Sequence, residues 1–218
     1  MSDSSVRKRI VLLAGATGLV GGECLRLLSS DDSETQLRAI IRRHLPPKLR
    51  LPGVSEHVVD FDKMDDAPEI FRVDQVFCAL GTTIRKAGSQ EAFRRVDYDY
   101  SLMIASLALE QGAKHFLLVS SLGANAGSHI FYNRVKGELE EAIIKLGYRS
   151  VTIARPSLLL GERDEFRLGE EIGKRIYWLL PKKWQPVQAT QVASSLVNSS
   201  KVDSPGIRIF ENSELITK

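Results

Sequence analysis

Tyr132 and Lys136 are four residues apart in a stretch with the apolar spacing of a helix, so their side chains fall on one helical face. Ser120 and Ser121 stand directly after an apolar run at residues 116–119 that predicts a buried strand. A hydroxyl, a phenol and an ammonium group together suit carbonyl–alcohol chemistry, in which the phenol exchanges a proton with oxygen as hydride moves at carbon. The sequence therefore predicts that Ser121, Tyr132 and Lys136 are the catalytic residues.

Each member of this triad has a separate expected task. A free phenol titrates at about pH 10, and a nearby ammonium favours its ionised form, so Lys136 would help Tyr132 to exchange protons near neutral pH. Lys136 could also hold the ribose hydroxyls of a nicotinamide cofactor. Ser121 would hydrogen-bond the substrate oxygen, and Ser120 could substitute for it. Because a Tyr and a Lys at this spacing also occur by chance on exposed helices, the assignment depends on the surrounding elements.

A glycine-rich turn joins an apolar run at residues 10–14 to a helical pattern at residues 19–28. Its candidate cofactor-binding residues are Gly15, Ala16, Thr17, Gly18, Leu19, Val20 and Gly21. The glycines would permit a tight turn, close approach of the backbone to a pyrophosphate, and close packing of the helix on the sheet. The helix N-terminus would offer free N–H groups to the phosphates. This context favours dinucleotide binding over a turn that serves backbone geometry alone.

Two arginines distinguish between the possible dinucleotides. A cofactor with a free ribose 2′-hydroxyl calls for an acidic residue at the end of the second strand, but Arg42 and Arg43 follow the apolar residues 39–41 there. Guanidinium groups suit a 2′-phosphate. The sequence therefore predicts NADP(H), although a solvated pair of charges at the start of a loop is the alternative.

Other candidates follow later strands, at the carboxyl edge where cofactors bind in sheets of this type. Asp60 and Phe61 would touch the adenine, although core filling explains Phe61 almost as well. Small residues after the fourth strand would let the cofactor lie across the sheet. The remaining cofactor-binding candidates are Leu80, Gly81, Thr82, Ser120, Arg155 and Pro156, with Pro156 alternatively a plain strand terminator.

Strand-length apolar runs alternate with helical patterns along the chain, which predicts an α/β fold with a single Rossmann-type doubly wound parallel sheet. Residues 1–218 read as a single NAD(P)-binding Rossmann domain, within which residues 157–218 form a short C-terminal embellishment on the substrate side. The predicted strands are 10–14, a second strand that closes with 39–41, 54–61, 73–80, 116–119, 151–154 and 206–210. The predicted helices are 19–28, 89–111, 131–146, 166–180 and 189–199.

Composition excludes several classes of protein. Thirty Lys and Arg against 27 Asp and Glu give a net charge of only +3, which argues against a nucleic-acid partner. Two cysteines and four scattered histidines predict neither a disulfide framework nor a metal site. The first apolar run is far too short to span a membrane, and the start of the chain does not resemble a targeting segment. We therefore expect a cytoplasmic protein whose partners are a nicotinamide dinucleotide and a small-molecule substrate.

Taken together, these motifs resemble the short-chain dehydrogenases/reductases, and more narrowly the atypical branch around the Tat-interacting oxidoreductase. The strings that carry the narrower resemblance lie at residues 78–88, 93–97, 120–124, 132–138 and 155–160. The resemblance implies a Rossmann fold, NADPH binding and reductase activity. Better-known branches carry Asn-Ala-Gly where this chain has Ala79-Leu80-Gly81, and a water-holding Asn where it has Asp97. A non-catalytic NADPH sensor, an interaction protein and an epimerase remain the alternatives.

Overall fold

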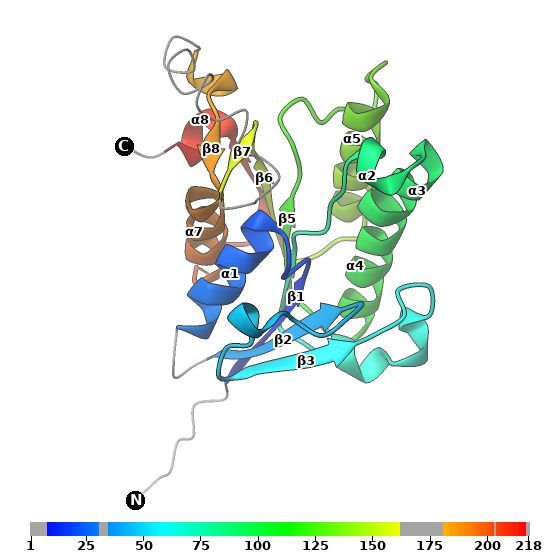
Figure 1. The fold of residues 1–218 in the computed structure, drawn as a ribbon, viewed down its shortest axis with the longest axis vertical. Helices are drawn as coiled ribbons and strands as arrows, with labels where there is room; N and C mark the ends of the chain where they lie inside the picture. The colour runs from blue at the N-terminus through cyan, green and yellow to red at the C-terminus, as the bar shows by residue number, and fades with distance from the viewer. Residues whose placement is uncertain (1–7, 31–34, 162–180, 203, 217–218) are drawn as a thin grey trace, which may run out of the picture.

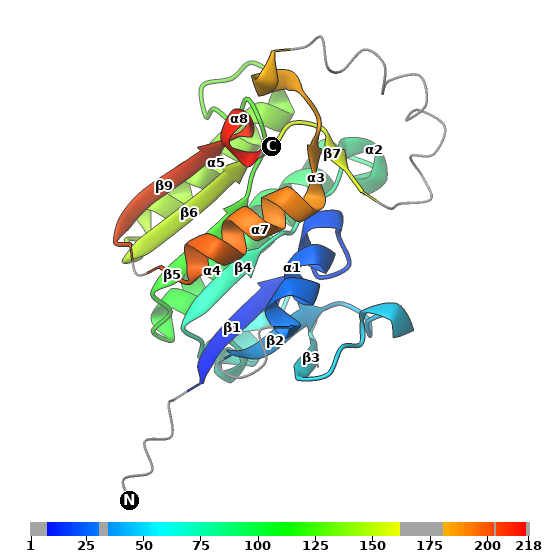
Figure 2. The same ribbon diagram turned by 90° about the vertical axis from the view of Figure 1, so that its left-hand side faces the viewer.

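A computed structural model describes residues 8–30, 35–161, 181–202 and 204–216. Its main element is a seven-stranded sheet in which every pairing is parallel, in the order β3-β2-β1-β4-β5-β6-β9. Figure 2 shows β3 and β9 at the two edges. The strands are β1 (Arg9–Ala14), β2 (Thr35–Ile41), β3 (Val54–Val58), β4 (Gln75–Cys78), β5 (His115–Val119), β6 (Ser150–Arg155) and β9 (Gly206–Glu211). The predicted Rossmann-type α/β fold is confirmed.

Helices cover both faces of this sheet (Figure 1). On one face, α1 (Leu19–Ser29) packs beside α7 (Ala189–Ser200). On the other face lie α4 (Tyr100–Glu110) and α5 (Phe131–Lys145). Parallel strands need such crossovers because each connection must return to the same end of the sheet.

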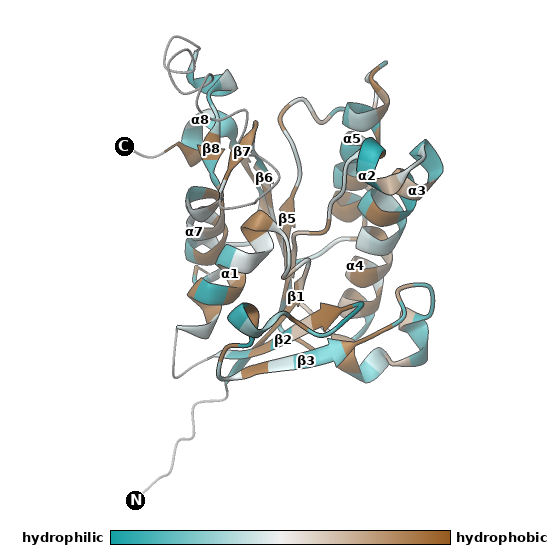
Figure 3. Cartoon of the chain, viewed as in Figure 1, coloured by the Kyte–Doolittle hydropathy of each residue, from teal (hydrophilic) through white to brown (hydrophobic). Residues whose placement is uncertain are grey.

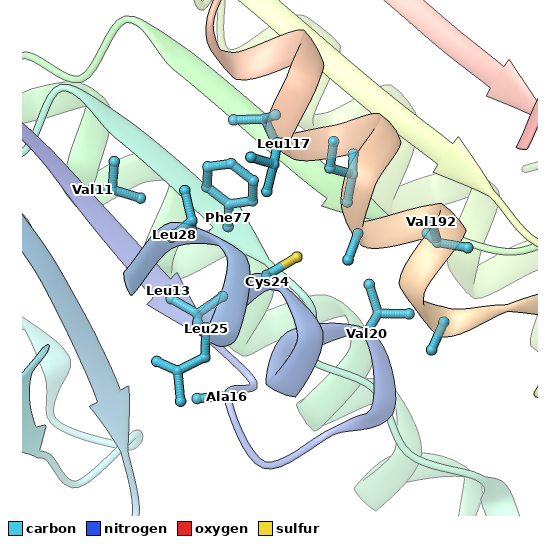
Figure 4. Close-up of a cluster of buried hydrophobic side chains, with 14 of the residues drawn as sticks. Val11, Leu13, Ala16, Val20, Cys24, Leu25, Leu28, Phe77, Leu117 and Val192 are labelled. Carbon is cyan, nitrogen blue, oxygen red and sulfur yellow. The ribbon is translucent and has the colours of Figure 1, made fainter. Parts of the chain in front are cut away.

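The apolar run of β1 fills both layers of the core, because successive side chains of a strand point to opposite faces. Val11 and Leu13 pack with α1 and α7, as the close-up in Figure 4 shows, whereas Leu12 and Ala14 pack on the α4–α5 side. All four residues are fully buried. Hydropathy separates buried from exposed elements, since β5 is hydrophobic over residues 116–119, whereas the middle of the exposed α2 (Ile84–Ala87) is hydrophilic (Figure 3).

The long helix predicted at residues 89–111 is confirmed in position but is not uniform. It consists of α3 (Gln90–Arg94), a π-helical turn η4 (Arg95–Asp99) and α4. The helix α2 is separate because Gly88, with a φ of +91°, ends it, and Ser89 caps α3 by accepting a hydrogen bond from the Ala92 N–H. The π-helical turn was not predicted, and it carries Asp97.

Two predicted strands are shorter in the structure. Because β3 ends at Val58, Asp60 and Phe61 lie in the following turn, where an Asp60 carboxylate oxygen accepts a hydrogen bond from the Asp62 N–H. Because β4 ends at Cys78, Leu80 and Gly81 lie in the loop that follows it. Short 3₁₀ turns lie at η1 (Pro47–Leu49), η2 (Met64–Asp66) and η3 (Pro68–Phe71).

The C-terminal segment contributes to the core layers. The predicted last strand is confirmed as β9, which pairs with β6, and the helix predicted at residues 189–199 is confirmed as α7. Smaller elements that the sequence did not indicate are β7 (Leu159–Leu160), η7 (Lys182–Trp184), β8 (Val187–Gln188) and α8 (Asn212–Leu215). The helix predicted at 166–180 lies outside the described residues. No helix in the described ranges has the length and apolar character to cross a membrane.

Candidate active site

The glycine turn after β1 lies against the end of β4. Gly15 has a φ of +87°, and a Cβ on it would lie 2.4 Å from the Ala79 carbonyl oxygen. The turn closes where the Gly18 N–H donates to the Gly15 carbonyl oxygen at 2.9 Å. Glycine is therefore required at position 15 by both backbone conformation and space.

The N-terminus of α1 is packed tightly on this turn, because a Cβ on Gly21 would lie only 2.0 Å from the Gly15 carbonyl oxygen. Gly18 precedes the helix, no side chain caps it, and its first turn holds no acidic residue. Uncapped N–H groups with the positive end of the helix dipole suit an anionic ligand. The turn and the helix together fit the pyrophosphate of a dinucleotide.

Arg42 and Arg43 follow β2 and are exposed. Within the part of the chain that the structure describes, neither guanidinium has a hydrogen bond or an ion pair. The positive charge of Arg42 acts on Tyr100, whose ring meets the edge of the buried Phe61 ring at a centroid distance of 5.5 Å. Arg42 is thus near the loop after β3, where the adenine ring was expected, and its charge is available to a ligand.

Lys136 is buried inside the protein at the start of α5. Its ammonium lies 2.8 Å from a carboxylate oxygen of Asp97, and the two side chains are 4% and 0% exposed. The other Asp97 oxygen accepts a hydrogen bond from the Thr82 N–H at 2.9 Å. A Cβ on Gly81 would lie 3.9 Å from the Lys136 nitrogen. These contacts bring Gly81, Thr82 and Lys136, three of the candidate cofactor-binding residues, close together.

Opposing effects act on the pKa of Lys136. Burial is the largest single effect and lowers the pKa, but the electrostatic influence of Asp97 and Tyr132 and the Asp97 contact together raise it above its ordinary value. The ammonium is therefore charged throughout the physiological pH range.

Tyr132 lies one turn before Lys136 on the same helix and is half-buried. Its ring packs against that of Phe93 from α3, with centroids 5.3 Å apart. The coupling between Tyr132 and Lys136 shows that the four-residue spacing brings the phenol and the ammonium into electrostatic contact.

The structure gives different surroundings to the hydroxyls of the two serines that follow β5. The Ser120 hydroxyl donates to a carboxylate oxygen of the buried Glu140 on α5, so it is committed to a contact inside the protein. The Ser121 hydroxyl is buried and has no hydrogen-bond partner among the residues that the structure describes. A buried hydroxyl without a partner is unfavourable unless something else completes it, so Ser121 rather than Ser120 is free to meet a ligand.

Arg155 is held by protein carboxylates. Its guanidinium contacts Glu140 at 2.5 Å and Glu211 at 2.8 Å, so its side chain is occupied and only its backbone remains for a cofactor. The Pro156 carbonyl oxygen accepts a hydrogen bond from the Leu122 N–H, which joins the chain after β6 to the chain after β5. Both residues lie at the expected edge.

Two residues of this region, Asp97 and Glu140, were not among the predicted site residues. Asp97 stood out in the sequence only as an acidic residue where better-known branches of the resembled family carry Asn. Glu140 lies four residues after Lys136, a spacing that places both on one helical face, but nothing local indicated its partners Ser120 and Arg155.

Comparison with known proteins supports the binding chemistry. Residues 15–165 match a family model described as NAD(P)H-binding. Protein HTATIP2 of Rattus norvegicus is 36% identical over 98% of this chain and 90% of its own length. The mitochondrial protein FMP52 of Candida albicans is 34% identical over 85% of each chain.

Solved structures show the same fold at low identity. The ADP-L-glycero-D-manno-heptose-6-epimerase of Helicobacter pylori superposes with a TM-score of 0.72 at 14% identity, covering 96% of this chain and 79% of the epimerase. MoeE5 in complex with UDP-glucose and NAD gives a TM-score of 0.71 at 14% identity, covering 93% of this chain and 75% of MoeE5. At this identity the likeness concerns the fold alone.

The relatives correct one expectation. The predicted cytoplasmic location is wrong, because FMP52 relatives from Candida albicans, Scheffersomyces stipitis and Eremothecium gossypii are named mitochondrial proteins. The prediction rested on reading no targeting segment at the start of the chain, and a sequence that lacks a recognisable signal does not determine location.

Two kinds of observation indicate the same binding chemistry. The structure has a glycine turn and an uncapped helix N-terminus, and the comparisons give a family match over residues 15–165 and relatives that span nearly the whole chain. The chain belongs to the NAD(P)H-binding family and is a relative of Protein HTATIP2 and the FMP52 proteins.

Proposed function

We propose that this protein is an NADP(H)-dependent oxidoreductase that transfers hydride between NADPH and a small carbonyl or alcohol substrate. The observation that carries the proposal is a continuous line of contacts along one edge of the sheet. Gly15 touches Ala79, and Gly81, two residues further on, lies beside Lys136. The candidate phosphate-binding turn and the candidate catalytic helix therefore meet at the loop after β4.

In the proposed reaction Tyr132 gives a proton to the substrate oxygen during reduction and takes one back during oxidation. Ser121 hydrogen-bonds the same oxygen, which completes its unpartnered hydroxyl and orients the substrate. Lys136 supplies a fixed positive charge beside the phenol and can donate to ribose hydroxyls. When bound, the nicotinamide ring supplies or accepts the hydride.

The preference for NADP(H) over NAD(H) rests on Arg42 and Arg43. Both are exposed at the end of β2, and no described carboxylate pairs with them. A 2′-phosphate would gain charge-assisted hydrogen bonds from two such guanidinium groups.

The test is Tyr132→Phe, which removes the phenolic hydroxyl and keeps the ring that packs on Phe93. NADPH affinity should be unchanged, and carbonyl reduction in a screen of small aldehydes and ketones should fall about 10²- to 10⁴-fold. Tyr98→Phe is the matched control, because Tyr98 is also half-buried but lies on η4. Equal turnover in wild type and Tyr132→Phe would contradict the catalytic role.

One observation favours a second function. The Asp97 carboxylate lies 2.8 Å from the charged Lys136 and offsets the effect of that charge on Tyr132, as would suit a protein that binds NADPH without turnover and reports on its oxidation state. Tight NADPH binding with no reduction of any carbonyl in the screen would support this sensor function.

The names of the fungal relatives support a mitochondrial site of action for this chain. Fractionation of cells that express a tagged copy would test it, and recovery of the tag outside the mitochondrial fraction would contradict it.

A further inference from the structure

We propose that Asp97 is a positioning residue that keeps Lys136 in its charged form and fixes the ammonium at the edge of the sheet. Asp97 lies at the centre of the π-helical turn η4, and Lys136 lies on the neighbouring helix α5. The two residues are 39 positions apart in the chain, and their pairing results from the packing of these two elements.

Asp97 and Lys136 form an ion pair that is shielded from water. The nitrogen–oxygen distance is 2.8 Å, and neither side chain has appreciable exposure to water. A buried ammonium without a partner is strongly unfavourable, and in most cases it loses its proton instead. The carboxylate of Asp97 removes that penalty.

Asp97 is itself held in place. Its second oxygen accepts the hydrogen bond from the Thr82 N–H at 2.9 Å, so the carboxylate cannot rotate away from Lys136 without losing a backbone contact. The neighbouring Gly81 has no side chain, and a Cβ there would already lie 3.5 Å from the carboxylate oxygen that faces Lys136. The loop after β4 and the lysine are thus joined through one carboxylate.

Among the described residues three titratable groups face Lys136, and Asp97 is the one in direct contact with its ammonium. The other two are Tyr132 on α5 and Cys78 on β4. Cys78 is buried, and burial raises the pKa of its thiol, so it does not supply a negative charge. Since burial by itself lowers the pKa of Lys136, removal of Asp97 should bring that pKa below the value of about 10.4 expected in the unfolded chain.

The role of the Asp97–Lys136 pair in catalysis rests on the proposed oxidoreductase function. A neutral amide at position 97 could not compensate a buried charge, whereas the carboxylate lets the ammonium stay charged beside Tyr132 before any cofactor binds. The ionisation of Lys136 is nevertheless a property of the folded chain and can be measured without turnover.

The experiment compares urea unfolding of the full chain in wild type, Asp97→Asn, Lys136→Met and the double variant between pH 7 and about pH 10. In Asp97→Asn the folded protein binds fewer protons than the unfolded chain, because the folded pKa of Lys136 lies below its unfolded value. Relative to the double variant, which carries the same cysteines but lacks Lys136, the stability of this variant should therefore rise with pH across that window. In wild type the folded pKa is raised, so the contribution of Lys136 is fully present below about pH 10 and is lost above it.

The double variant is the decisive control. Lys136→Met removes the charge that Asp97→Asn leaves unpaired, so the double variant should be more stable than Asp97→Asn at pH 7, with the difference shrinking toward pH 10. If Asp97→Asn does not fold at pH 7, recovery of folding in the double variant supports the proposal equally.

Asp97 could alternatively act only through the Thr82 hydrogen bond. In that case Asp97→Asn and the double variant would be destabilised alike, by an amount that does not change with pH, or both would fail to fold. Either result would overturn the proposal. Loss of turnover in Tyr132→Phe is measured separately, so failure of the oxidoreductase function would leave this thermodynamic result intact.

Discussion

Gly15 and Ala79 are in such close contact that the carbonyl oxygen of Ala79 occupies the space of a side chain on Gly15. A Cβ there would lie 2.4 Å from that oxygen, where the backbone φ is +87°. The contact fixes the distance between the glycine turn and the end of β4, so substitutions at this point test the proposed cofactor site directly.

Gly15→Ala should destabilise the protein by more than about 2 kcal/mol and abolish NADPH binding. The left-handed conformation alone costs an alanine about 1–2 kcal/mol, and the collision with backbone adds to it. Gly147→Ala is the matched control, because Gly147 has a φ of +83° and open space around its Cβ position. Urea unfolding and nucleotide fluorescence provide the measurements, and equal destabilisation of the two variants would contradict the importance of the Ala79 contact.

Replacement of both Arg42 and Arg43 by alanine should weaken NADPH binding by about 10- to 100-fold, the range for lost hydrogen bonds to a charged group, and leave NADH binding unchanged. Binding titrations with both nucleotides check this selectivity. Arg26→Ala serves as a control because Arg26 is exposed on α1 and pairs with Glu23. A parallel loss of affinity for NADH would show that the arginines do not recognise the 2′-phosphate.

Ser121→Ala and Ser120→Ala should have opposite consequences. The Ser121 hydroxyl has no hydrogen-bond partner in the described part of the chain, so its removal should leave stability within about 0.5 kcal/mol and reduce turnover. The Ser120 hydroxyl donates to Glu140, so its removal should destabilise the protein by about 1 kcal/mol. Thermal unfolding and the carbonyl-reduction assay separate these effects, and a stability loss confined to Ser121→Ala would reverse the assignment.

The two cysteines should be unreactive in the folded protein. Cys24 lies in the core between α1 and α7 (Figure 4), where burial raises its pKa to about 12, and burial also raises the pKa of Cys78. Neither thiol should react with an aromatic disulfide reagent at pH 8, whereas both should react in urea.

The raised pKa of Cys24 predicts that folding stability depends on pH. The folded chain keeps the Cys24 proton above pH 9, where the unfolded thiol ionises, so stability should fall as pH rises from about 9 to 11. Cys24→Ala should show a shallower fall in the urea midpoint. A native protein in which Cys24 reacts readily at pH 8 would be inconsistent with the packing in Figure 4.

The spacing of residues along the chain explains which helices, strands and motifs the sequence by itself determined. The apolar residues 10–14 predict a strand because they must be buried on both faces, and the glycines that follow fit one conformation of the turn into α1. Tyr132 and Lys136 share a helical face by virtue of the helix period alone. The order of such elements also determined the parallel sheet, since strands joined by helices return to the same edge.

Tertiary packing decided which groups pair between elements. No local pattern indicated the ion pair of Asp97 with Lys136, because it requires the π-helical turn to lie against α5. Likewise, Ser120 and Ser121 are adjacent and chemically identical, and only the position of Glu140 commits the first to the interior and leaves the second unpartnered. Which side chains pair depends on long-range contacts, and the energies of these contacts are set by burial and distance. The sequence determined the chemical groups at this edge of the sheet, whereas the packed structure determined which of them remain available to a ligand.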